Sequence, residues 1–223
     1  MQRNDKGSRV ARRAVQYAAG LICMALGVVL IRKANIGISP LSAIPAAVSN
    51  VTSLTLGNAS ILFHILCTVG QLILIRGIRL KAILTLPLAF GFGYLIDLLM
   101  FLLGPEPRLI PLRIILCLTG IIASGLGIAL IVGADLMLPA PDAFLREASV
   151  FFKRPLSQVK TVGDIIWVAI TAVIELLTIG RLNCVGVGTV ASMLLTGRFV
   201  GLFQRLFPGI DLSSKHSKQI DTL

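Results

Sequence analysis

A few charged side chains lie inside apolar stretches of the sequence, where they can do chemistry that the neighbouring residues cannot. Asp97 and Glu175 lie within apolar runs, and Arg198 lies in a glycine-rich run. A charge in the middle of a bilayer costs about 3 kcal/mol on insertion scales, so each group is expected to face a partner or water. The chemistry that these residue types allow is ion pairing, proton uptake by a carboxylate, or binding of a charged part of a solute.

Each of these residues has a structural role as an alternative. Asp97 either forms a structural ion pair with Arg32-Lys33 or takes part in transport or proton transfer. Glu175, if unpaired and kept from water, could carry a proton. Arg198 either extends its charge to the membrane interface, holds an anionic group of a substrate, or pairs with Asp135.

Two proline-containing segments interrupt long apolar runs one hundred residues apart. The first spans 35–45 and the second spans 135–144. Proline removes a backbone donor and clashes with the preceding turn, so neither helix is expected to continue through its segment. Inside a membrane, freed backbone groups are tolerated where protein or a water-filled cavity satisfies them, and two matching breaks point to a transporter-type binding site. The residues expected at such a site are Asn35, Ser39, Pro40, Ser42, Asp97, Asp135, Pro141, Asp142, Glu175 and Arg198.

The same segments also fit a simpler interpretation, in which they are interfacial loops whose proline and Asx residues cap the next helix. A further pair, His64 and Asp164, occupies matching places about one turn into a helix. Asp164 near a helix N-terminus is favoured electrostatically without any function. Both interpretations of the segments and of this pair remain open at the level of sequence.

The composition indicates a polytopic membrane protein. Apolar residues make up 56% of the 223 residues, and the mean hydropathy is +0.91. Windows of about 20 residues with few charges are long enough to cross a hydrocarbon core. Six such spans are expected, at about 14–31, 58–75, 82–103, 114–133, 162–179 and 184–203.

The two halves of the chain resemble each other at a shift of one hundred residues. Seven positions from Gly20 to Ala34 have identical partners between Gly120 and Ala134, and Ala43 matches Ala143. Three spans per half is an odd number, so the halves are expected to insert with opposite orientation. We therefore predict an all-α membrane fold of six helices in two inverted three-helix repeats, each with a proline-broken segment after its first helix. Small residues along the first and fourth spans predict a close crossing of these two helices.

The chain is expected to form one polytopic domain without a separate soluble domain. Its parts are a cytoplasmic tail at 1–13, repeat one at 14–103, an outer loop at 104–113, repeat two at 114–207 and a cytoplasmic tail at 208–223, which is polar and expected to be disordered from Ser213. Most of the 21 Lys and Arg residues then lie on the side of both termini. The positive-inside rule accordingly predicts a bacterial cell membrane protein with cytoplasmic termini and a retained first span.

Several functional classes lack support in the sequence. The net charge of +11 comes from residues at the ends of apolar runs, which favours topology over nucleic-acid binding. The four cysteines lie in or beside apolar runs without CxxC spacing, so neither disulfides nor a zinc site is expected. Nucleotide-binding loops, an HExxH motif and a nucleophile elbow are absent, so no enzyme activity, cofactor or metal is expected.

The interrupted segments and the ends of two spans resemble a known family. The segment Gly37-Ile38-Ser39-Pro40, followed by Ser42, and its counterpart Pro141-Asp142 are similar to the YczE/YyaS/YitT-like family of bacterial membrane proteins. The runs 93–97 and 186–189 also look like features of that family. Ser42 stands where the family has its first aspartate, whereas Asp142 keeps the second, so this chain has one of the two carboxylates. The resemblance implies a membrane location and this type of fold.

These observations predict a membrane transporter or permease for an unidentified small solute, with its site at the interface of the repeats. The alternative is a substrate-capture or regulatory membrane subunit without transport of its own. Both place the chain in a lipid bilayer and leave a homo-oligomer or a partner subunit open.

Overall fold

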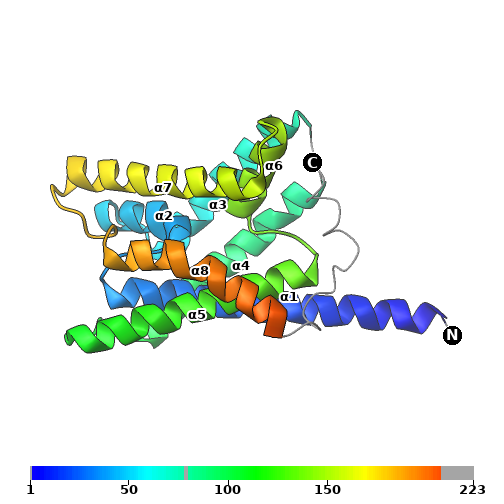
Figure 1. The fold of residues 1–223 in the computed structure, drawn as a ribbon, viewed down its shortest axis with the longest axis horizontal. Coiled ribbons are helices and arrows are strands. Elements are labelled where there is room, and N and C mark those ends of the chain that lie inside the picture. Colours follow the sequence, from blue (N-terminus) through cyan, green and yellow to red (C-terminus); the bar gives the residue numbers. More distant parts are fainter. Residues whose placement is uncertain (1, 78–79, 207–223) are drawn as a thin grey trace.

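The computed structural model describes residues 2–77 and 80–206, which form eight α-helices without strands (Figure 1). Six helices are long and apolar enough to cross a membrane, and two are short. The helices are α1 (Gln2–Ala34), α2 (Pro40–Val51), α3 (Leu56–Ile75), α4 (Leu80–Leu102), α5 (Ile110–Ala134), α6 (Ala140–Phe151), α7 (Leu156–Thr178) and α8 (Val187–Leu206).

The six long helices correspond to the six predicted spans, but most begin earlier than predicted. α5 begins at Ile110 and α7 at Leu156, because both proline-flanked starts lie outside the apolar windows. α1 also extends back to Gln2, through the segment predicted as an N-terminal tail. The predicted C-terminal tail at 208–223 lies outside the described residues.

The two proline-containing segments form short helices rather than loops. α2 and α6 have 12 residues each, and their bounds differ by one hundred positions. Each follows a left-handed residue that stops the preceding long helix, Asn35 at φ 51° and Asp135 at φ 50°. Asparagine and aspartate tolerate this conformation better than other non-glycine residues, which explains why α1 and α5 end at these positions.

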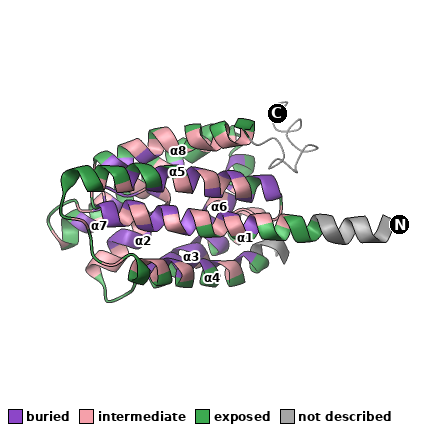
Figure 2. Cartoon of the chain, turned by 90° about the horizontal axis from the view of Figure 1, so that it is seen from below, coloured by how far each residue is buried: buried purple, intermediate pink, exposed green. Residues whose placement is uncertain are grey.

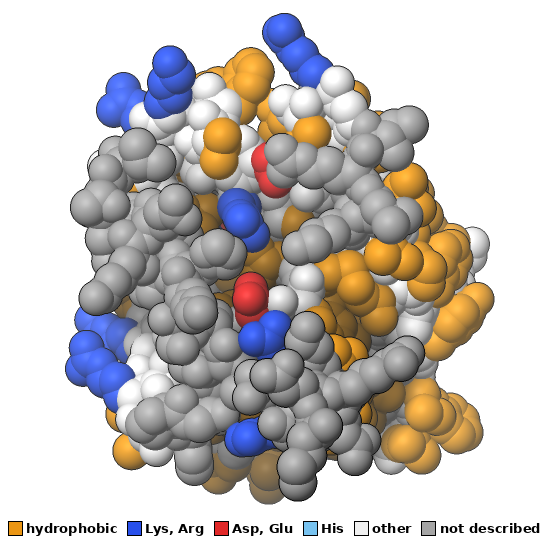
Figure 3. Space-filling model, turned by 90° about the vertical axis from the view of Figure 1, so that its right-hand side faces the viewer, with side chains coloured by type: hydrophobic (Ala, Val, Ile, Leu, Met, Phe, Trp, Pro, Cys, Tyr) orange, Lys and Arg blue, Asp and Glu red, His pale blue; other side chains and the backbone are white. Residues whose placement is uncertain are grey.

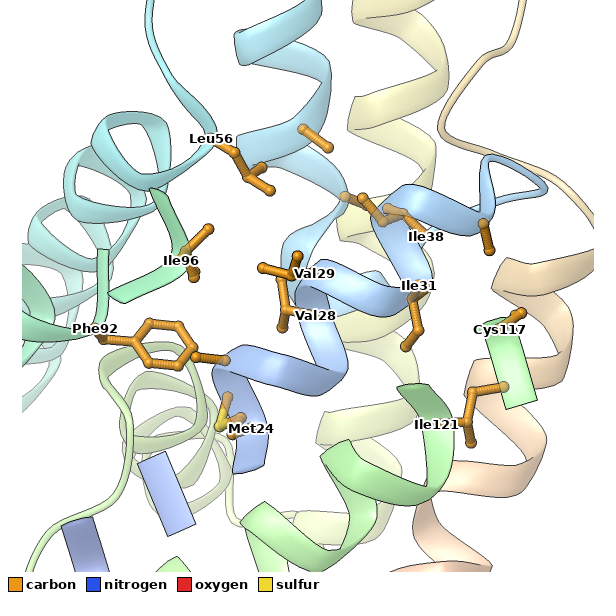
Figure 4. Close-up of a cluster of buried hydrophobic side chains, with 14 of the residues drawn as sticks. Met24, Val28, Val29, Ile31, Ile38, Leu56, Phe92, Ile96, Cys117 and Ile121 are labelled. Carbon is orange, nitrogen blue, oxygen red and sulfur yellow. The ribbon is translucent and has the colours of Figure 1, made fainter. Parts of the chain in front are cut away.

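The centre of the molecule is the crossing of α1 and α5. A Cβ atom on Gly20 would lie 2.8 Å from Ile131 Cγ1, and one on Gly120 would lie 2.7 Å from Ile31 Cγ1. Such contacts leave no room for a larger residue, so glycine allows the two backbones to approach closely. The predicted close crossing is therefore present. Beside it, Met24, Val28 and Val29 of α1 pack toward Phe92 and Ile96 of α4 (Figure 4).

The remaining helices pack around this crossing in a matched way. α4 lies on α1 and α8 lies on α5, while short helix α2 packs on α7 and short helix α6 packs on α3. The buried residues line the middle of the bundle, and the outer sides are exposed (Figure 2). Large apolar side chains such as Phe101 (83% exposed) and Leu177 (81%) lie on these outer sides, as expected for contact with lipid.

The bundle has two ends that differ in their connections. We call the end where α1 begins and α8 ends the terminal face, and the opposite end the distal face (Figure 1). Because α1 and α5 each end just before a short helix and run in opposite directions, α2 follows α1 at the distal face and α6 follows α5 toward the terminal face. The two interrupted segments therefore belong to opposite halves of the bundle.

Candidate functional site

A small cavity of about 20 Å³, with room for about one water molecule, lies in the half of the bundle toward the terminal face, and part of it is open to the surroundings. Its walls come from α1, α3 and α4, and the start of α6 closes one side. Tyr17, His64 and Thr85 are its polar side chains, each from a different long helix. The other lining residues are Leu21, Met24, Leu88, Ala89, Phe92, Leu138, Pro139 and Ala140.

The start of α6 reaches this cavity because the chain turns sharply after α5. Asp135 stops α5, and the extended backbone of Pro139, at φ −53° and ψ 144°, leads into α6. Pro141 lies in the first turn of α6, where a missing N–H has no consequence for the helix. Residues 138–140 are thereby fixed as one wall of the cavity.

A cluster of three charged side chains lies beside the cavity. Lys160 Nζ on α7 is 2.9 Å from Asp142 Oδ1 on α6 and 3.8 Å from Asp164 Oδ1 one helical turn away. Both carboxylates are 18% exposed, and the lysine is 46% exposed. Asp142 is also close enough to His64 to act on it electrostatically. The cluster connects α6, which forms a wall of the cavity, to α7.

A second polar group lies at the distal face around Glu175, which is fully buried at the end of α7. Its carboxylate accepts hydrogen bonds from the backbone N–H of Asn183 and of Cys184, both at 2.9 Å, and from Asn50 Nδ2 at 3.3 Å. Asn50 in turn accepts a bond from Arg32 at 2.7 Å. With these partners, the carboxylate holds the loop between α7 and α8 against α2.

Cys184 is the cysteine in that loop, and it is buried with a free thiol. Burial, together with the neighbouring Glu175 carboxylate, raises the pKa of Cys184 to about 12. The sulfur also accepts a bond from Asn50 Nδ2 at 3.2 Å. A thiol with so high a pKa is neither a nucleophile nor a metal ligand at neutral pH, so its role here is packing.

The start of α2, one hundred residues before the cavity wall of α6, is closed by α8 and its preceding loop. The backbone N–H of Ile38 donates to the Cys184 carbonyl at 2.8 Å and to Thr189 Oγ1 at 3.1 Å. Gly188 N donates to the Ile36 carbonyl at 2.8 Å. Gly37 has a φ of 120°, and a Cβ there would lie 2.7 Å from Thr189 N. We call this set of contacts the distal seal.

The predicted site residues divide between the two ends of the bundle. Asp142 lies beside the cavity in the charged cluster with Asp164, and Pro141 adjoins the cavity-lining Ala140. The structure does not bring the remaining predicted residues into one place. Asn35, Ser39, Pro40, Ser42, Asp97 and Glu175 lie toward the distal face, while exposed Asp135 and Arg198 lie in the terminal half.

The expected partners of two charged residues differ from those observed. Asp97 caps the N-terminus of α3: its Oδ2 accepts from Thr55 Oγ1 at 2.6 Å, and its Oδ1 accepts from Gly57 N at 2.7 Å. Arg32 instead lies 3.8 Å from Glu106, so it does not pair with Asp97. The reason is that Asp97 faces α3 rather than α1.

The other expected ion pair is also not formed. Among the described residues, Arg198 and Asp135 make no ion pair, and both are exposed. Lys33 donates to the Gly104 carbonyl, and Asn35 donates to Glu106 Oε2 at 2.8 Å. These contacts join the end of α1 to the loop after α4, so they stabilise the distal face without forming a site.

The sequence reasoning missed Tyr17, Thr85 and Lys160. Tyr17 and Thr85 lie in apolar spans without any charge or proline to mark them. Lys160 had a usable signal, its i,i+4 spacing to Asp164, which places both on one helix face. Within residues 2–77 and 80–206, no group of three or more His, Cys, Asp or Glu side chains is arranged to hold a metal ion.

Comparison with known proteins identifies a family and no closer relative. A family model described as "Family of unknown function (DUF6198)" matches residues 11–205, nearly the whole chain. No curated protein and no solved structure matches the chain. The match gives no link to the YczE/YyaS/YitT-like proteins.

Proposed function

The chain belongs to the DUF6198 family of unknown function, and from its fold and cavity we propose that it is a membrane transporter for a small solute. The transporter is built from two repeats of opposite orientation, and a relation to the YczE/YyaS/YitT-like family is part of the proposal. The cavity beside His64 marks where the solute enters from the terminal side, and in the described conformation it has room for about one water molecule.

Matched contacts support the two repeats. The short helices share a length of 12 residues and a shift of one hundred positions, and their preceding left-handed residues share the same shift. The contact of Gly20 with Ile131 has its counterpart in the contact of Gly120 with Ile31. The packing of α2 on α7 likewise has its counterpart in the packing of α6 on α3. An exchange of the two halves maps each of these contacts onto its partner, as expected for an inverted repeat.

One observation carries the proposal of transport: the two matching places differ in whether they are open. Leu138, at the start of α6, is half-buried and lines the cavity, although Ala140 two residues later is only 2% exposed. Their counterparts Ile38 and Pro40, at the start of α2, are buried, and Ile38 is 2% exposed beneath the distal seal. In an inverted repeat, exchange of the two local conformations would close the cavity at Leu138 and open the start of α2 at Ile38. Alternating access then follows from rocking of one half against the other.

The charge distribution supports an orientation with the terminal face in the cytoplasm. Figure 3 shows this face, where Lys and Arg side chains lie at several points, both near its edge and near its middle. Arg76, Arg154 and Arg205 are exposed there, near the ends of α3, α6 and α8. Loops rich in lysine and arginine stay on the cytoplasmic side. We therefore propose a cell membrane location in which the cavity opens from the cytoplasmic side.

The test measures from which side each place can be reached. Ile38→Cys and Leu138→Cys are introduced separately after replacement of the four native cysteines, and a membrane-impermeant maleimide is added to one side of oriented vesicles. Alternating access predicts labelling of Leu138→Cys from the terminal side and slower labelling of Ile38→Cys from the distal side. Two further variants serve as controls. Val29→Cys in the core should stay unlabelled, and Leu54→Cys in the distal loop should be labelled quickly.

If Ile38→Cys never reacts while Leu54→Cys does, the distal seal does not open, and the proposal of transport by alternating access is wrong. A chain that holds a solute from one side only would then be the substrate-capture or regulatory subunit that the sequence left as the alternative.

A further inference from the structure

An arginine lies on the lipid-facing side of α8. Arg198 is exposed, and the side chains one turn before and after it, Leu194 and Leu202, are 59% and 46% exposed. Residues four apart share one face of a helix, so Arg198 faces the same surroundings as these leucines. α8 packs mainly on α5 and lies at the edge of the bundle (Figure 2). In a membrane, Arg198 therefore points away from the protein and into the bilayer.

The position of Arg198 along α8 is close to the middle of the span. At a rise of about 1.5 Å per residue, Arg198 lies about 12 Å from Leu206 and about 16 Å from Val187, the two ends of the helix. Its neighbour Phe199 packs on α5, where a Cβ atom on Gly125 would lie 2.7 Å from Phe199 Cβ. Gly125 belongs to the part of α5 that crosses α1, so Arg198 is level with the centre of the bundle.

Neither the headgroups nor the chain itself provides a partner for this charge. The Cα–Cβ bond of a helical residue tilts toward the start of its helix. For α8 the start is at the distal face, so the Arg198 side chain leads away from the nearer headgroups on the terminal side. Within the described residues, Arg198 forms no ion pair and no side-chain hydrogen bond. An arginine at this depth is costly unless it has a partner.

A second copy of the chain does not provide the partner either. The acidic residues whose side chains the structure describes either interact within the chain or lie at the end of a helix. They are Asp97, Glu106, Asp135, Asp142, Glu147, Asp164 and Glu175. α8 itself has no acidic residue, so two α8 helices packed against each other would bring like charges together.

The surface of α8 beside Arg198 is shaped to admit another helix. Gly197 and Gly201 are one turn apart, and a Cβ atom at either position would have nothing within 4 Å. Gly201 also follows Arg198 by three residues, which places it next to the arginine on the helix surface. Glycines with this spacing allow the backbone of a second helix to approach closely within a membrane.

We propose that the face of α8 from Leu194 to Leu202 binds a transmembrane helix of a partner protein that carries an aspartate or glutamate at mid-depth. The carboxylate pairs with the Arg198 guanidinium, and the partner's backbone lies against Gly197 and Gly201. Because hydrocarbon screens charges far less than water does, each of the two charges stabilises the other. This proposal is independent of transport, since it concerns the outside of the bundle and not the cavity.

The experiment measures binding of synthetic transmembrane peptides to the full chain in phosphatidylcholine vesicles. Three leucine- and alanine-based peptides differ only in their central residue, which is glutamate, glutamine or leucine. Energy transfer from a donor on the chain, attached at Leu54→Cys after replacement of the native cysteines, to an acceptor on the peptide gives the apparent affinity. The glutamate peptide is expected to bind about tenfold more tightly than the leucine peptide, and the glutamine peptide should lie between them.

Variants assign the preference to this face of α8. Arg198→Leu should remove the preference for glutamate, whereas Arg205→Leu, seven residues later at the end of the same helix, should retain it. Gly201→Leu should weaken binding of the glutamate peptide several-fold, because it fills the space for the partner. Gly91→Leu on α4, where a Cβ atom also has nothing within 4 Å, should leave binding unchanged. If melting curves show that Arg198→Leu is unstable, Arg198→Gln replaces it.

Four results would overturn the proposal. The first two are equal binding of the three peptides and a preference for glutamate that persists in Arg198→Leu. The third is loss of the preference when phosphatidylglycerol is added to the vesicles, which would mean that an anionic headgroup reaches Arg198. The fourth is energy transfer between two labelled copies of the chain that is lost in Arg198→Leu, which would make a second copy the occupant. Labelling of Ile38→Cys tests transport separately, so failure of one proposal leaves the other standing.

Discussion

Replacing Gly27 by alanine is expected to separate α1 from α5 and to destabilise the whole bundle. A Cβ atom at this position would lie 2.5 Å from Ser124 N and 2.6 Å from the Gly120 carbonyl oxygen, and closer still to Ser124 Oγ. Two of these three atoms belong to the backbone of α5. They cannot rotate away as a side chain could, so the helices themselves must move.

The magnitude follows from comparison with a glycine that has free space. Gly91 on α4 has nothing within 4 Å of the position of a Cβ. Alanine gains about 1 kcal/mol of helix propensity at either position, so the difference between the two variants isolates the overpacking. Overpacking a close-packed contact costs about 1–3 kcal/mol. We expect Gly27→Ala to be about 2 kcal/mol less stable than Gly91→Ala, since backbone atoms form the contact.

Thermal unfolding in detergent, followed by circular dichroism, measures this difference. For a chain of this size, about 2 kcal/mol corresponds to a Tm lower by about 4–8 °C. Gly120→Ala should show a similar loss, because a Cβ there would lie 2.7 Å from Ile31 Cγ1 and 2.9 Å from the Gly27 carbonyl oxygen. If Gly27→Ala and Gly91→Ala melt at the same temperature, the two helices are not packed as closely as described.

Three further predictions concern the charged residues and the buried thiol. Asp97→Ala removes two hydrogen bonds that cap α3, so we expect it to lower the free energy of unfolding by about 2 kcal/mol. Asp97→Asn retains one acceptor and should lose less in the same chemical or thermal unfolding experiment. Equal stability of the wild type and Asp97→Ala would refute the cap. Lys160→Met should change stability by at most about 1 kcal/mol, since the lysine is 46% exposed, and a larger loss in the same melt would mean that the cluster is more buried than described. Because the pKa of Cys184 is raised to about 12, its thiol stays protonated through neutral pH. In a variant with Cys184 alone, the rate of maleimide labelling of the folded protein should stay low from pH 7 to pH 9. In denaturant the rate should rise over the same range; a similar rise in the folded protein would contradict the burial. Glu175→Ala should release the loop and allow this labelling.

The sequence predicts the long helices and both interruptions because their signals are local. Apolar runs of about 20 residues, and the prolines that follow Asn35 and Asp135, are visible within single windows. The glycine crossing was also predictable, since Gly20 and Gly120 repeat at a fixed shift. The apolar pattern could not predict the start of α7. This helix begins before its apolar run and therefore includes Lys160.

The cavity could not be predicted because its polar groups come from three helices that only the tertiary packing brings together. Tyr17, His64 and Thr85 are spread over α1, α3 and α4, and no pattern along the chain connects them. Asp97 shows the same limit. Its charge in an apolar run suggested an ion pair or a transport role, but its partners are Thr55 and Gly57, about forty residues earlier on another helix.

The most direct test of the central claim is whether opening of the two matching places is mutually exclusive. A protein with both Ile38→Cys and Leu138→Cys is first treated with a bulky impermeant maleimide from the terminal side, and the rate of labelling from the distal side is then measured. Modified Leu138→Cys holds the cavity open, so we predict that labelling of Ile38→Cys slows strongly compared with the single variant. An unchanged rate would show that the two places move independently, and the account of two exchanging repeats would be contradicted.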